Sequence, residues 1–81
     1  MARVEIVVIP SITVEGDQAA IQFQEVVMPA RHKRLTRQRA DVKDAIIING
    51  TDMKFARTFP VVQGDAVHII YKGYRYDMGV I

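Results

Sequence analysis

Turn signals recur along this chain at short intervals, and the stretches between them alternate apolar and polar residues as β-strands do. The strongest signal is Asn49-Gly50, because these two residue types tolerate the positive φ that a two-residue hairpin turn requires. No segment carries the apolar stripe of an amphipathic helix. Strands are indicated at 3–9, 20–28, 45–48, 51–58, 67–71 and 74–78. We therefore expect an all-β fold, a small antiparallel β-barrel or sandwich of about six strands with one long basic loop.

Two irregularities are expected in the first two strands. Pro10 should bend the first strand, because proline gives the sheet no backbone donor. In the second strand the apolar positions slip by one residue between Phe23 and Val26, which predicts a bulge near Glu25. Pro29 should end that strand.

The length of the chain favours association. Eighty-one residues are expected to form a single domain, residues 1–81. A chain of this size buries only about 60–65% of the surface that its unfolded form exposes. It has no cysteine, so no disulfide can add stability. Oligomerisation often compensates in such cases. No signal peptide or apolar run of membrane-spanning length is visible, and we expect an intracellular protein that does not enter a membrane.

The densest charge lies between residues 31 and 39, where five cations and His32 occur without an acid. The rest of the chain has six basic and nine acidic residues, a net charge of −3. We expect a long loop over residues 30–43 that contacts a polyanion or an acidic partner surface, with a solvated charge run as the plain alternative. The candidate contact residues are Arg31, Lys33, Arg34, Arg37 and Arg39.

No catalytic group is evident, and an enzyme, a metal site and a bound cofactor are not expected. The two histidines, His32 and His68, lack further ligands at a spacing typical of metal sites. Three tyrosines flank the last turn, and they suit either packing across a hairpin or a protein interface. These interface candidates are Tyr71, Tyr74 and Tyr76.

Residues 62–80, VQGDAVHIIYKGYRYDMGV, combine a Gly-Asp turn, an apolar strand, a tight turn with glycine and an aromatic-rich strand ending near a valine. This stretch resembles the C-terminal hairpin of tailed-phage head–tail joining proteins, also called head-closure or stopper proteins. Residues 54–58, KFART, resemble the strand that precedes this hairpin in the same proteins. Together the two stretches cover about a third of the chain.

The resemblance implies a structural virion protein of a tailed phage, assembled in the host cytoplasm. Its subunits would form a homo-oligomeric ring, a connector or neck component that joins the portal or adaptor to the tail. The basic loop would then point into the DNA channel or contact neighbouring subunits. Two alternatives stand beside this expectation. One is a small β-barrel that binds nucleic acid through non-specific phosphate contacts of the basic loop. The other is an inhibitor or accessory factor that uses this loop against an acidic enzyme surface.

Overall fold

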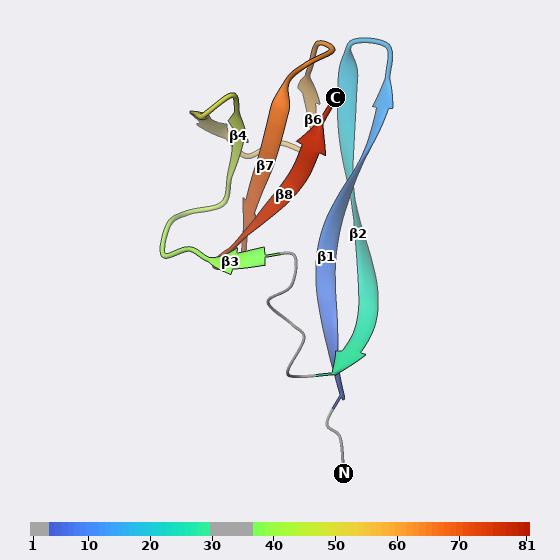
Figure 1. The fold of residues 1–81 in the computed structure, drawn as a ribbon, viewed down its shortest axis with the longest axis vertical. Helices are drawn as coiled ribbons and strands as arrows, with labels where there is room; N and C mark the ends of the chain where they lie inside the picture. Colours follow the sequence, from blue (N-terminus) through green and yellow to red (C-terminus); the bar gives the residue numbers. More distant parts are fainter. Residues whose placement is uncertain (1–3, 30–36) are drawn as a thin grey trace.

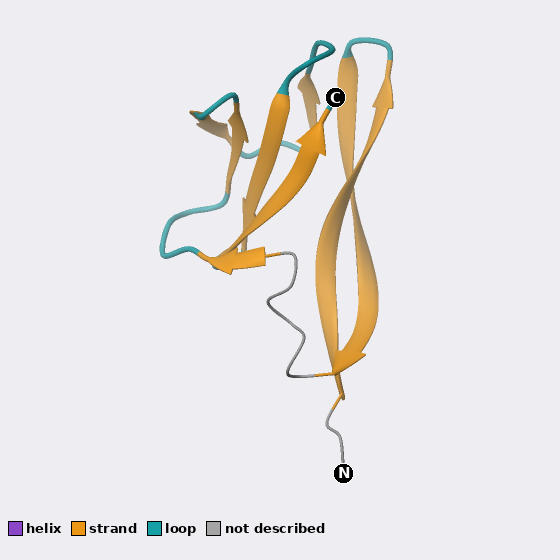
Figure 2. Cartoon of the chain, viewed as in Figure 1, coloured by secondary structure: helices purple, strands orange, loops and turns teal. Residues whose placement is uncertain are grey.

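The computed structural model describes residues 4–29 and 37–81, and every regular element in them is a β-strand (Figure 2). The strands form two antiparallel sheets, one of three strands in the order β1-β2-β6 and one of five in the order β3-β8-β7-β4-β5 (Figure 1). Their bounds are β1 Val4–Glu15, β2 Gln18–Pro29, β3 Arg37–Arg39, β4 Ala45–Ile48, β5 Thr51–Lys54, β6 Thr58–Pro60, β7 Ala66–Tyr71 and β8 Tyr74–Val80.

The all-β prediction is confirmed, and of the two architectures expected the protein adopts the sandwich-like one, because its two sheets do not close into a barrel. The described residues contain eight strands where six were expected. One addition is β3, which lies inside the predicted basic loop. The other arises because the predicted strand 51–58 is divided: β5 stays in the second sheet, whereas β6 pairs with β2 in the first.

The β1–β2 hairpin runs in unbroken register from the Val4–Pro29 pair to the Glu15–Gln18 pair. The bulge predicted near Glu25 is therefore wrong, since Glu25 pairs directly with Val8. Pro10 lies inside the continuous strand β1. It is tolerated because β1 is an edge strand of its sheet, where a missing backbone donor need not remove a ladder hydrogen bond.

Two tight turns organise the second sheet. Asn49 and Gly50 have φ values of 50° and 82°, as the predicted type I′ turn between β4 and β5 requires. Lys72 and Gly73, at 47° and 84°, join β7 to β8 in the same way. Met53 of β5 pairs with the buried Ile46, but all four residues of β5 are exposed, and β5 is an edge strand of this sheet.

The core lies between the inner face of the second sheet and the half of the β1–β2 hairpin nearest its turn. Its buried members come from four strands and the segment after β6: Ala19, Ile21, Ile46, Phe59, Val61, Val67 and Ile69. The other half of the hairpin runs past the second sheet (Figure 1), and the molecule measures 46 × 25 × 19 Å. We call this projecting half, residues 4–9 of β1 and 24–29 of β2, the arm.

The Asn49-Gly50 turn provides a test of backbone strain alone. A Cβ placed on Gly50 would meet no atom within 4 Å, so a substitution there changes the backbone preference without a clash. Gly50→Val should lower the free energy of unfolding by about 1–2 kcal/mol, the penalty for positive φ in a branched residue. The measurement is denaturant unfolding, with Thr51→Val on the adjacent exposed strand as control. Equal losses in the two variants would contradict the strained turn.

Candidate interaction surfaces

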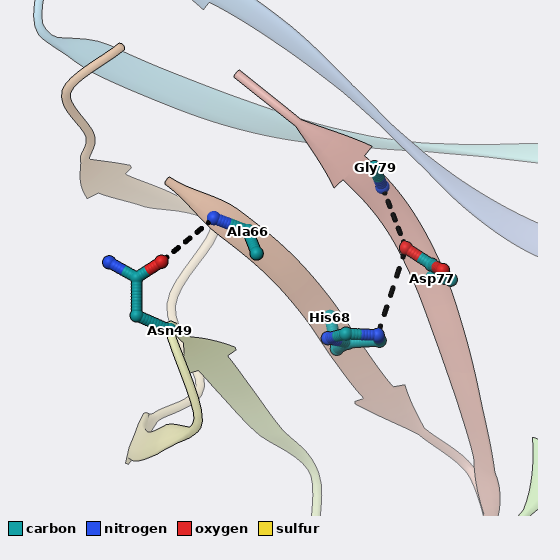
Figure 3. A network of polar contacts seen from close by, with 5 residues as sticks. All are labelled: Asn49, Ala66, His68, Asp77 and Gly79. Atoms are coloured by element: carbon teal, nitrogen blue, oxygen red, sulfur yellow. Dashed lines mark hydrogen bonds and ion pairs between the residues drawn. The ribbon is translucent and has the colours of Figure 1, made fainter. Parts of the chain in front are cut away.

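A polar network on the second sheet links the neighbouring strands β7 and β8. His68 Nε2 lies 3.7 Å from Asp77 Oδ1, across the β7–β8 pair (Figure 3). The same oxygen accepts a 2.8 Å hydrogen bond from the Gly79 backbone N–H. Among the described residues no three His, Cys, Asp or Glu side chains are grouped so that they could hold a metal ion.

Asn49 has a second role that its turn signal did not reveal. Its backbone N–H donates to the Ala66 carbonyl at 2.9 Å, and its Oδ1 accepts from the Ala66 N–H at 3.0 Å (Figure 3). Its Nδ2 donates to Asp65 Oδ1, and the other oxygen of Asp65 accepts from the Val62 N–H, both at 3.0 Å. One side chain thereby ties the β4–β5 turn to the loop that precedes β7.

The basic segment is only partly within the described residues. Arg31, Lys33 and Arg34 lie outside them. Arg37 and Arg39 belong to β3, where they pair with Tyr76 and Tyr74 of β8. The Arg39 side chain is exposed. The predicted loop over residues 30–43 thus contains a short strand, which adds a fifth strand to the second sheet.

Backbone contacts hold the chain on the C-terminal side of β3. The Ala40 N–H donates to the Gly73 carbonyl at 2.9 Å, beside the β7–β8 turn. Four residues later, Asp44 Oδ1 accepts from the Lys72 N–H, also at 2.9 Å. The end of the basic segment is therefore fastened to one end of the second sheet.

The three candidate tyrosines differ in how much surface they present. Tyr76 is only 3% exposed, so it offers a partner no surface in the isolated chain. Tyr71 and Tyr74 are half-buried. The Tyr71 ring packs between two phenylalanines, with its centroid 4.5 Å from that of Phe23 and 5.9 Å from that of Phe55.

Cations and aromatic rings do meet, but away from the basic segment. The Arg57 guanidinium lies 5.3 Å from the centroid of the Phe23 ring, and Lys72 Nζ lies 5.5 Å from that of Tyr71. Lys72 and Tyr71 are neighbours in the chain, whereas Arg57 and Phe23 come from distant segments, and no local pattern could have revealed that second pair. The contacts already occupy the rings within the chain, where exposed cation–π pairs stabilise by about 0.5–1 kcal/mol each.

The arm carries the most conspicuous apolar surface among the described residues. Side chains of one sheet face, from β1 and β2 together, are largely uncovered: Val4 and Ile6 are 66% exposed, Val27 64% and Val8 42%. Ile6 and Val27 are direct cross-strand partners, with Val4 and Val8 on either side, so the four share one face. We call these four residues the arm face.

The opposite face of the arm is covered by the chain itself. Val7 is only 7% exposed, and its cross-strand partner Val26 is half-buried. Val26 and Val27 are apolar because they serve the two opposite faces of the arm, not because the strand slips by one residue. Sequence reasoning interpreted this signal as a bulge and missed the surface.

The comparisons with known proteins found no matching family model, no similar curated protein and no similar solved structure. No helix in residues 4–29 and 37–81 is long and apolar enough to cross a membrane.

The rings of Phe23, Phe55 and Tyr71 form an aromatic cluster. This cluster and the core should lose different amounts of stability when a phenylalanine side chain is truncated. Phe59 is buried in the core cluster, and Phe59→Ala should cost about 3–5 kcal/mol. Phe55 is only partly buried against that cluster, so Phe55→Ala should cost less, about 2 kcal/mol. Thermal and denaturant unfolding measure both losses. A greater loss for Phe55→Ala than for Phe59→Ala would show that the aromatic cluster, rather than the core, dominates stability.

Proposed function

We propose that this chain is a structural assembly protein without catalytic activity, a ring-forming connector subunit of the tailed-phage neck that joins portal to tail. The arm face is the observation that carries the proposal. A projecting ribbon with four uncovered valine and isoleucine side chains suits a protein that another molecule covers.

Energetics support an assembled form. A two-stranded ribbon is marginally stable by itself, and the arm has only one of its two faces covered within the chain. Burying a valine or isoleucine side chain completely contributes about 1.5–3 kcal/mol. Covering the arm face would thus add several kcal/mol, a large share of the stability expected for a domain of this size.

The particular setting, a phage neck, rests on the resemblance of residues 62–80. In the structure these residues comprise the loop before β7 and the β7–β8 hairpin with its Lys72-Gly73 turn. Within that setting the neighbours would be further copies of the chain, the portal or adaptor above and the tail proteins below. Packaged DNA would pass the basic segment.

The second candidate function, non-specific binding of nucleic acid, is favoured by the placement of charge around β3. Gln38 of β3 pairs with Arg75 of β8, so Arg75 lies beside the end of the basic segment. Arg39 is exposed on the same short strand. This brings a cation from the C-terminal hairpin next to the basic segment, as a phosphate-contacting surface requires.

Charge on the arm face tests the assembly function. Ile6→Lys should raise the protein concentration needed for oligomer formation at least tenfold, because assembly would bury the charge. Val62→Lys is the matched control, since Val62 is also 66% exposed but lies outside the arm. Native mass spectrometry over a dilution series gives the oligomeric state, and circular dichroism checks the fold. An unmodified chain that stays monomeric at every concentration would contradict the proposal.

Salt dependence separates the two functions. If all five cations of the basic segment engage phosphates, log K against log salt should have a slope of roughly −4.5 on duplex DNA. Arg34→Ala should reduce the magnitude of this slope by about 0.9 and leave the melting temperature of the protein nearly unchanged. Fluorescence anisotropy with duplexes of unrelated sequence provides the measurement. Tight, salt-sensitive binding by a monomer would favour the second function, and binding that is insensitive to salt would exclude it.

A further inference from the structure

The Asn49-Gly50 turn is chemically reactive as well as tightly bent. Asn49 is the only asparagine in the sequence, and Gly50 follows it. The backbone nitrogen after an asparagine can attack the carbon of the side-chain amide, and glycine hinders this attack least because it carries no Cβ. Both residues are exposed, and a Cβ on Gly50 would meet no atom within 4 Å. Neighbouring side chains therefore do not shield the reacting groups from solvent.

Hydrogen bonds hold the reactive amide in the folded chain. Asn49 Oδ1 accepts from the Ala66 N–H and Nδ2 donates to Asp65 Oδ1, each at 3.0 Å. The amide thus points toward the start of β7 (Figure 3). Closing a ring with the Gly50 nitrogen requires the amide to turn back toward its own backbone, and these two bonds resist that rotation. We call the two bonds the turn clamp.

The turn can open without much loss of core. All four residues of β5, Thr51–Lys54, are exposed, and β5 is an edge strand. Separating β5 from β4 at the turn therefore uncovers little apolar surface of β5, which is typical of segments that open locally. Opening breaks the turn clamp, and one of its bonds is to a charged carboxylate. The clamp is therefore a large part of the free energy that keeps the turn closed.

We propose that Asn49 is a site of spontaneous deamidation, where water converts the side-chain amide to a carboxylate, and that the turn clamp sets the rate. While the turn is closed, the amide is held away from the attack. The rate in the folded chain is then the rate in an unfolded chain multiplied by the fraction of time that the turn is open. The site is independent of the proposed assembly function.

The reaction needs only water as a co-reactant. The Gly50 nitrogen gives up its proton to solvent and forms a bond to Asn49 Cγ. The bond from Cγ to Nδ2 breaks, and Nδ2 leaves as ammonia with a proton taken from water. Water then opens the resulting cyclic imide at one of its two carbonyl carbons. Breaking the new bond to Cγ gives aspartate, and breaking the original peptide bond gives isoaspartate. Nothing is oxidised or reduced.

Either product disrupts the turn clamp. A carboxylate at position 49 has no proton to donate, so Asp65 Oδ1 loses its donor and faces a second negative charge at short range. Isoaspartate also adds a carbon atom to the backbone of a turn whose strands pair on either side of two residues, from Ile48 to Thr51. The modification therefore weakens the closed turn irreversibly.

The effect should extend to the loop that precedes β7. The other oxygen of Asp65 accepts from the Val62 N–H at 3.0 Å, and the Asp65 carbonyl accepts from the Ile81 N–H at 2.9 Å. The Gly64 N–H donates to the Ile81 carbonyl, also at 2.9 Å. Loss of the turn clamp thus loosens the residue that links the β4–β5 turn to this loop and to the residue after β8.

The sequence makes the reaction assignable to one position. Asparagine occurs only at residue 49, and no aspartate precedes a glycine, so isoaspartate should form first there. Trypsin releases residues 44–54 as one peptide, between Lys43 and Lys54. Mass spectrometry of this peptide during incubation gives the rate of ammonia loss, and fragmentation separates aspartate from isoaspartate.

The role of the clamp is tested by comparing rates in buffer and in denaturant. The unmodified chain should react at least about tenfold more slowly in buffer, because the turn is mostly closed. Asp65→Ala should react about tenfold faster than the unmodified chain in buffer but equally fast in denaturant, because it loses a hydrogen bond of the clamp. Asp52→Ala is the matched control, since it also removes one carboxylate, from exposed β5. Circular dichroism checks that each variant is folded.

Equal rates in buffer and in denaturant for the unmodified chain would overturn the proposed protection, whether or not the variants fold. Equal rates for folded Asp65→Ala and the unmodified chain in buffer would overturn the role of the clamp. An equal acceleration by Asp52→Ala would do the same. Absence of any product from the unfolded chain would overturn the site itself.

The consequence of the modification is tested with its product. Asn49→Asp should lower the melting temperature by about 4–8 °C, the shift expected when about one net hydrogen bond is lost in a domain of this size. Aspartate tolerates positive φ, so backbone strain is not the cause. Adding Asp65→Asn should restore most of the loss, because an amide at position 65 again faces a carboxylate at position 49. An unchanged melting temperature for Asn49→Asp would overturn the predicted weakening of the turn.

Discussion

The structure depends on one mismatch, between a long hairpin and the short sheet that covers it. β1 and β2 each have twelve residues and span about 40 Å, whereas β7, at the centre of the second sheet, has six and spans about 20 Å. Burial of the hairpin's apolar face can therefore proceed along only half its length. The core forms there, and the other half projects as the arm. Within residues 4–29 and 37–81 no further layer covers both faces of that arm.

Local chemistry determined the parts of the fold that the sequence predicts well. Asn49-Gly50 requires positive φ at consecutive residues, and only a tight hairpin turn uses both, so the β4–β5 pairing follows from two residues. The alternation of Val67, Ile69 and Tyr71 likewise predicts a strand with one face inward, because β7 is covered mainly on that side. Such signals involve neighbours in the chain, and they need no knowledge of the rest of the fold.

The parts that could not be predicted depend on distant segments. β3 and β6 have three residues each, too few to show a period, and they are strands only because β8 and β2 offer them partners. The register of β2 was misjudged for another reason. The alternation of apolar and polar residues reveals the register of a strand only when one of its two faces is apolar. In the arm both faces carry apolar residues, so the adjacent Val26 and Val27 give the same pattern as a strand that slips by one residue. For the same reason the sequence did not predict the arm face, and the run of charges at residues 31–39 became the main candidate surface instead.

The edge of β1 adds a second uncovered surface to the arm. An uncovered edge strand rich in valine and isoleucine recruits other strands indiscriminately, and proteins usually protect such edges with lysine, proline or a bulge. β1 has no lysine and no bulge, and its one proline, Pro10, stands at the boundary between the body and the arm. That position interrupts the row of backbone donors along the edge but leaves residues 4–9 unprotected. Packing by side chains on the arm face would hold a partner in a defined register, which edge pairing alone does not enforce. The arm therefore presents two uncovered surfaces, the side chains of the arm face and the backbone edge of residues 4–9.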